Sequence, residues 1–176
     1  GNILLGFAIL MFGMSTMSGS VSSLKENPQF IDMLTKFSNP IIGIIVGMLF
    51  TCVLQSASAS IGILQSLAVT GAVSFATALP LTMGIGIGAA LPVLLSSLGA
   101  TTAGKRTAVV YLVIDVLGAI ICGVVFYAAD AAVGFSFMSN SMTMVSIALM
   151  NTVYRLVIVI VLFPMIGLLK RLTEFI

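Results

Sequence analysis

The chain has 176 residues, of which 60% are hydrophobic and only 7% are charged, and its mean hydropathy is +1.26. A soluble domain carries about one quarter charged residues, so these values exclude a soluble globular fold and indicate an integral membrane protein. The net charge of +2 comes from seven basic and five acidic residues, placed mostly at the ends of apolar segments. Such a distribution reports membrane topology and excludes a nucleic-acid partner.

The apolar segments are long and uncharged, which favours membrane helices over the alternating pattern of a membrane barrel. We therefore predict an all-α integral membrane fold in a single domain over residues 1–176. The chain begins at Gly1 without a methionine and without the features of a signal peptide, so we expect a trimmed or partial chain. The predicted segments are a span at 1–24, an interfacial helix at 28–37, a re-entrant hairpin at 40–71, a broken span at 74–99, and spans at 105–130 and 141–171.

The hairpin is predicted from a polar cluster, Gln55 to Ser60, between two short apolar runs. The first run, Ile41 to Leu54, has 14 residues and would reach about 21 Å as a helix, too short to cross a bilayer. Two half-length helices that meet at a polar tip describe a re-entrant hairpin. Such a tip is tolerated at membrane depth only where it is buried in protein or lines an aqueous cavity.

The glycine run Gly84, Gly86 and Gly88 lies in the middle of the next apolar segment. The spacing is not that of a dinucleotide-binding motif, and no strand precedes it. One interpretation is an unwound backbone whose freed amides and carbonyls face a ligand, as in discontinuous transporter helices. The other is a seam for close helix packing, and the sequence does not decide between them.

Basic residues predict the orientation of the chain. Lys105 and Arg106 begin the fifth predicted segment, and Lys170 and Arg171 end the sixth, so the two spans form an antiparallel hairpin with both basic pairs on one side. Basic residues concentrate on the cytoplasmic side of membrane proteins. Residues 101–106 and 170–176 are therefore predicted to be cytoplasmic.

Two charged residues, Asp115 and Arg155, lie inside these last two spans. An isolated charge in the bilayer centre costs about 2.5 to 3.5 kcal/mol on insertion scales. We predict an ion pair or a shared polar network between them, the alternative being that each finds separate hydroxyl or carbonyl partners.

No catalytic site and no transition-metal site is expected. The chain has no histidine, and Cys52 and Cys122 lie in apolar segments without metal-binding spacing. Nothing in the sequence resembles a nucleophile paired with a base.

Several motifs, over residues 3 to 171, resemble those of the type II sodium-dependent phosphate (Na/Pi) cotransporters and their bacterial relatives. They are Asn39-Pro40-Ile41-Ile42-Gly43, the stretch Leu54 to Gln65 with its Gln-Ser-Ala-Ser-Ala-Ser core, Ala78-Leu79-Pro80, the glycine run, and Gly104 to Ala108. The family carries a Gln-Ser-Ser-Ser motif once in each of two inverted repeats. The copy in this chain is similar to that of the second repeat, which implies one half of an inverted-repeat transporter fold in a bacterial inner membrane.

The resemblance implies a site for phosphate and sodium near the midplane. Gln55, Ser56, Ser58 and Ser60 would bind the substrate and ion, with sodium held by the first three. Sodium prefers hard oxygen ligands, and phosphate accepts hydrogen bonds from hydroxyls and from amides at helix N-termini. The three glycines would contribute backbone groups. No cofactor is implied beyond sodium as the coupling ion.

This chain departs from the family pattern at several positions. The family usually has Gly-Gln-Asn-Ile-Gly-Thr-Thr where this chain has Gly84 to Ala90, and the middle serine of its motif is Ala57 here. In the last two helices, the family often carries His and Asn at i and i+4. The corresponding residues are Tyr111 with Asp115, and Asn151 with Arg155, so a polar pair is replaced by a charged network.

The function implied is symport of inorganic phosphate or a similar small anion with sodium. The alternative is a scaffold or anion sensor that keeps the fold and has lost transport. Only one motif copy is present, so the site would be completed by a second repeat, a partner subunit or a second copy of the chain within the lipid bilayer.

Overall fold

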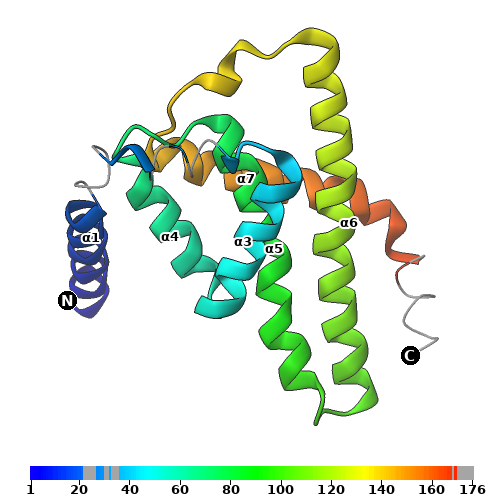
Figure 1. Cartoon of the computed structure of the whole chain (residues 1–176). Coiled ribbons are helices and arrows are strands. Elements are labelled where there is room, and N and C mark those ends of the chain that lie inside the picture. Colours follow the sequence, from blue (N-terminus) through cyan, green and yellow to red (C-terminus); the bar gives the residue numbers. More distant parts are fainter. Residues whose placement is uncertain (22–26, 30–31, 33–35, 168, 170–176) are drawn as a thin grey trace.

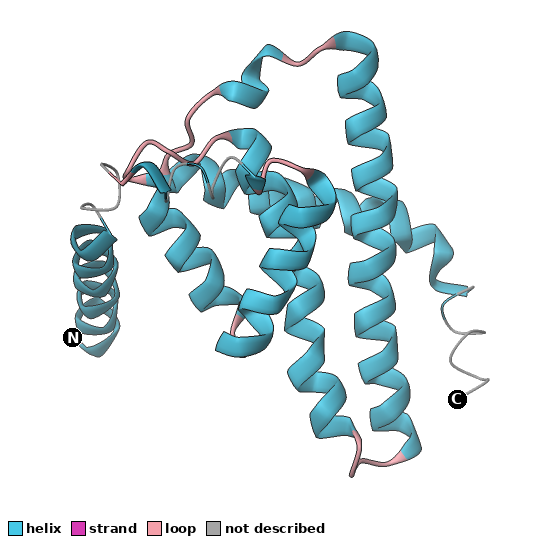
Figure 2. Cartoon of the chain, viewed as in Figure 1, coloured by secondary structure: helices cyan, strands magenta, loops and turns pink. Residues whose placement is uncertain are grey.

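The computed structural model describes residues 1–21, 27–29, 32, 36–167 and 169. Its described part is helical, with one isolated bridge between Ser74 and Ser141 (Figures 1 and 2). Half of the predicted interfacial helix at 28–37 lies outside the described residues. The elements are α1 (Asn2–Val21), α3 (Pro40–Leu54), α4 (Ala57–Ala68), α5 (Phe75–Ser97), α6 (Thr102–Val133), η2 (Ser136–Ser139), α7 (Met144–Leu162) and η3 (Phe163–Met165).

Three helical stretches in the described part are long and apolar enough to cross a membrane: Phe75–Ser97, Thr102–Val133 and Met144–Met165. The prediction of a multi-pass, all-helical membrane fold is thereby confirmed for the described residues, as judged by helix length and composition. Helix α1 is a further apolar helix of 20 residues, drawn at the left of Figure 1. It contacts α4. Large apolar side chains face outward, among them Ile3 and Ile160, and hydrocarbon is the solvent that suits such faces.

Helix α3 packs closely against α5, and its start is well defined. Pro40 occupies the first turn, and the Asn39 side chain accepts hydrogen bonds from the backbone N–H groups of Ile41 and Ile42 at 3.1 and 3.3 Å. Proline suits a first turn because it lacks the N–H that would otherwise need a partner there. The chain therefore enters α3 at a fixed residue.

Glycines on both helices allow this close packing. A Cβ atom built on Gly84 would lie 2.8 Å from the backbone nitrogen of Met48, and one on Gly88 would lie 2.8 Å from Thr51 Cβ. On the other side, Gly47 meets the backbone of Leu81, and Gly43 meets the ring of Pro80. The two backbones are thus in direct contact, as in small-residue seams of membrane helices.

The prediction of a span broken at the glycine run is wrong. Helix α5 is continuous from Phe75 to Ser97 and contains both Pro80 and Pro92. The glycines at 84 and 88 are needed for the approach of α3. Because α3 fills the space beside them, an unwound backbone there would lose helix hydrogen bonds in an apolar environment without gaining a ligand.

Helix α7 crosses α5 and α6 instead of running alongside α6 as the sequence analysis predicted. In Figure 1, α5 and α6 lie side by side, and α7 passes behind both. The crossing with α6 is at Gly118, where an added Cβ would meet the Ile158 side chain at 2.7 Å. After α6, the chain returns to the start of α5, where Met142 N–H donates to Val73 O at 2.8 Å.

Replacing Gly84 with alanine tests the seam between α3 and α5. The new methyl group would press on the α3 backbone, and overpacking of this kind costs about 1–3 kcal/mol. We expect Gly84→Ala to lower the thermal unfolding midpoint of the detergent-purified protein.

Gly62→Ala is the matched control, because Gly62 lies in α4 with nothing within 4 Å of an added Cβ. It should leave the midpoint unchanged or raise it, since alanine is favoured over glycine in a helix by about 1 kcal/mol. Equal effects of the two changes would contradict the seam.

Candidate functional site

The tip between α3 and α4 turns on Gln55. This residue has φ 54° and ψ 23°, and it is the one non-glycine residue with positive φ in the described part of the chain. Its N–H donates to Thr51 O at 2.7 Å, which caps α3. Left-handed backbone is uncommon for a residue with a side chain, and glycine is the usual residue in such a turn. Here glutamine occupies the turn and places an exposed side-chain amide at the tip.

Helix α4 begins directly after this turn. Ser56 is its N-cap, and the Ser56 hydroxyl accepts a hydrogen bond from Ala59 N–H at 3.2 Å. Ser56 is half-buried, whereas Ser58 in the first turn is exposed. The N-terminus of a helix carries partial positive charge and favours anions. Gln55 and Ser58 therefore present polar groups beside an electropositive helix end.

Ser60 has a different environment from its neighbours. It is fully buried, its hydroxyl donates to Ser56 O at 2.9 Å, and it accepts from the Thr51 hydroxyl at 3.0 Å. Thr51 is fully buried on α3, so this bond ties the two arms together. The sequence analysis missed Thr51; its position one turn before the tip was the available signal. A ligand role for Ser60 stays a prediction, and in the structure its hydroxyl has a bracing role.

The three glycines predicted to bind substrate face two different sides of α5. Gly84 and Gly88 meet the backbone of α3, whereas a Cβ on Gly86 would meet Arg155 Nη2 at 3.1 Å and Asp115 Oδ1 at 3.4 Å. The run therefore does not present one continuous surface to the tip. Its role in binding stays a prediction.

The structure contains the predicted ion pair. Arg155 Nη1 donates to Asp115 Oδ1 at 2.7 Å, linking α7 to α6 where these helices cross. The side chain of Asp115 is 3% exposed and that of Arg155 is 36% exposed. Tyr111 and Asn151, each one turn before a member of the pair, are half-buried, and no hydrogen bond joins them to the pair among the described residues.

One oxygen of this pair has no partner. Asp115 Oδ2 is buried without a hydrogen bond among the described groups, and so is the hydroxyl oxygen of Thr82. Thr82 and Gly86 are four residues apart on α5 and therefore lie on the same helix face, the one that meets Asp115. Buried polar atoms without partners are uncommon in folded proteins, and each calls for an explanation.

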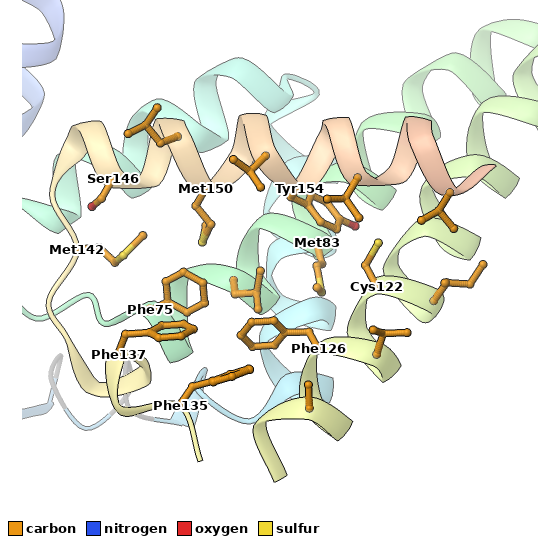
Figure 3. Close-up of a pocket in the computed structure, with 18 residues that line it drawn as sticks. Phe75, Met83, Cys122, Phe126, Phe135, Phe137, Met142, Ser146, Met150 and Tyr154 are labelled. Carbon is orange, nitrogen blue, oxygen red and sulfur yellow. The ribbon is translucent and has the colours of Figure 1, made fainter. Parts of the chain in front are cut away.

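A cavity of about 670 Å³ lies between α5, α6, η2 and α7 (Figure 3). Phe75 and Phe137 meet edge to face at its wall with ring centroids 5.0 Å apart. Its one serine, Ser146, is engaged in the cap of α7. Among the described residues no charged side chain lines this cavity, and its polar side-chain groups are the hydroxyls of Ser146 and Tyr154 and the thiol of Cys122. The sequence analysis missed it because its walls come from separate segments, with residues such as Met83, Cys122, Phe126, Phe135, Met142, Met150 and Tyr154.

Removing one member of the ion pair should destabilise the protein. We expect Asp115→Asn and Arg155→Gln each to lower the free energy of unfolding by about 3 kcal/mol, near the lower end for a buried pair because Arg155 is partly exposed. The double variant should lose clearly less than the sum, because it leaves no unpaired charge. Unfolding of the four proteins in detergent measures this coupling, and simple additivity would show that the bond contributes nothing.

Comparison with known proteins gives two matches. A family model described as Na+/Pi-cotransporter matches residues 9–152. The uncharacterized protein YqeW of Bacillus subtilis (strain 168) is 26% identical over 175 residues, covering 98% of this chain and 55% of YqeW. The chain therefore spans about half the length of this curated relative. No solved structure matches the chain significantly.

Proposed function

Because the chain belongs to the Na+/Pi-cotransporter family, we propose that it transports inorganic phosphate or a similar small anion together with sodium, as one repeat of a two-repeat transporter. The observation that supports particular residues as the binding site is the exposure of Gln55 and Ser58 at the start of α4. Its substrate, its coupling ion and the arrangement of repeats are all part of the proposal.

The tip has the chemistry for both solutes. An amide oxygen and serine hydroxyls are hard oxygen ligands of the kind that suits sodium, and the hydroxyls and first-turn amides of α4 can donate to phosphate. Gln55 places its side chain at the reversal, and Ser58 lies within the first turn. In this proposal, Gln55, Ser56 and Ser58 bind the ion and the anion, and Ser60 braces the tip through Thr51.

We propose that α3 and α4 form the re-entrant hairpin. They have 15 and 12 residues, or about 22 and 18 Å of helix, against the roughly 20 residues needed for a full span. In Figure 1, α3 runs away from the start of α5 and α4 returns toward it, so the chain enters and leaves the pair at one end. This geometry supports a tip at membrane depth.

A second half would complete the transporter. The length of YqeW, of which this chain covers 55%, supports a second repeat or a partner chain. A tip at membrane depth requires surrounding protein or an aqueous cavity. In this proposal, the second half, or a second copy of this chain, supplies the surface that encloses Gln55 and Ser58.

Sodium-driven uptake of labelled phosphate into proteoliposomes tests the proposal. The variants are Gln55→Gly, which removes the amide while glycine keeps the left-handed turn, and Ser58→Ala, which removes an exposed hydroxyl. We expect each to reduce sodium-dependent uptake at least about tenfold, because a ligand that the second half encloses would contribute about 1.4 kcal/mol or more.

Ser20→Ala is the matched control, because Ser20 is an exposed helical serine on α1 whose hydroxyl bonds only within its own helix. It should transport at the level of the unchanged protein. If saturable uptake is unchanged in both tip variants, the tip is not the binding site. Phosphate binding without sodium-driven flux would instead indicate a sensor.

A further inference from the structure

Asp115 is the fixed member of the charged pair, and its free oxygen is an unused acceptor. The carboxylate is 3% exposed, with Oδ1 bonded to Arg155 and Oδ2 buried without a partner among the described residues. An ionised carboxylate can only accept hydrogen bonds. Thr82, on the face of α5 that also carries Gly86, adds a second buried oxygen without a partner and is able to donate or accept.

Arg155 is the movable member. Its side chain is 36% exposed and makes one hydrogen bond to Asp115, although a guanidinium carries five donors. Its second terminal nitrogen lies over Gly86, where any other residue would place a Cβ. Among the described basic residues, Lys36 precedes α3 and pairs with Asp32, and Lys105 and Arg106 lie in the first turns of α6. Arg155 instead lies well inside α7. Arg155 is thus the basic group placed to meet an anion within the membrane.

Donors beside a free acceptor distinguish between oxyanions. Phosphate at neutral pH still carries at least one proton, so it offers an O–H donor as well as acceptor oxygens. Sulfate is fully deprotonated at the same pH and only accepts. A carboxylate with an open oxygen therefore favours phosphate, because sulfate would leave that oxygen unpaired and add repulsion.

We propose that Asp115 and Arg155 form a second recognition site, specific for a protonated tetrahedral oxyanion. The Arg155 guanidinium binds the oxygens of the anion, and Asp115 Oδ2 accepts the hydrogen bond from its protonated oxygen. In the structure the pair is closed on itself, with Arg155 Nη2 lying over Gly86, and Arg155 swings away from Asp115 as the anion enters. This inference rests on the proposed transport function and names the residues that determine its substrate.

The experiment measures the binding of inorganic phosphate and of sulfate to the detergent-purified protein by calorimetry. We expect the unchanged protein to bind phosphate more tightly than sulfate. Asp115→Asn should shift the ratio of the two dissociation constants toward sulfate by at least about tenfold, because an asparagine amide can donate to an unprotonated oxygen.

Arg155→Lys covers the case in which Asp115→Asn does not fold. Lysine keeps the charge opposite Asp115 but lacks the planar fork of donors. We expect weaker phosphate binding by about tenfold, with the preference over sulfate retained because Asp115 is intact. Phosphatidylglycerol should not compete in any of these proteins, since its phosphodiester carries no proton; competition would assign the site to lipid head groups and overturn the proposal.

The inference and the transport function fail in different ways. If Arg155→Lys leaves both dissociation constants unchanged, or the unchanged protein binds neither anion, the second site is excluded. If the tip variants abolish uptake while phosphate selectivity is the same in Asp115→Asn, the transport function stands and the second site does not. If binding depends on Arg155 and Asp115 but sodium drives no flux, the second site stands without transport.

Discussion

The contact between the backbones of α3 and α5 is the interaction on which the rest of the structure depends. Gly43 and Gly47 on one helix, and Gly84 and Gly88 on the other, remove the side chains that would hold the helices apart. Their contacts advance together along both helices, so α3 and α5 run parallel, and the connecting helix α4 has to run in the opposite direction. That return requires a tight reversal after α3, and the reversal is where the polar residues gather.

Helix α5 separates the two polar regions of the chain, the tip and the charged pair. Gly84 and Gly88 face α3, and Thr51, four residues before Gln55, lies beside Gly88. Gly86 faces the opposite side, toward Asp115 and Arg155. The tip and the charged pair are therefore different places, separated by α5. An anion that visits both would pass from one to the other around this helix, and they would not act together as one binding pocket.

Features that depend on local sequence were predictable, and features that depend on packing were not. The strongly apolar runs gave the helices, and the polar interruption at Gln55 marked the tip, because a helix that short cannot cross a bilayer. The cost of isolated charge was enough to predict that Asp115 and Arg155 meet. The glycine run was ambiguous because unwound backbone and close packing both require glycine, and only the position of α3 decides between them. The bond from Thr51 to Ser60 and the crossing of α7 likewise depend on contacts between segments.

Three departures from the family pattern, at Gly86, Asp115 and Arg155, lie next to one another in the structure and are explained together. The family usually carries an asparagine where this chain has Gly86, and polar uncharged residues where it has Asp115 and Arg155. A Cβ at position 86 would lie 3.1 Å from Arg155 Nη2 and 3.4 Å from Asp115 Oδ1, so the rest of an asparagine side chain would have to enter the space that the ion pair occupies. Loss of the amide therefore makes room for the charges. Instead of one polar side chain from α5, α6 and α7 together supply the donors and acceptors at this place.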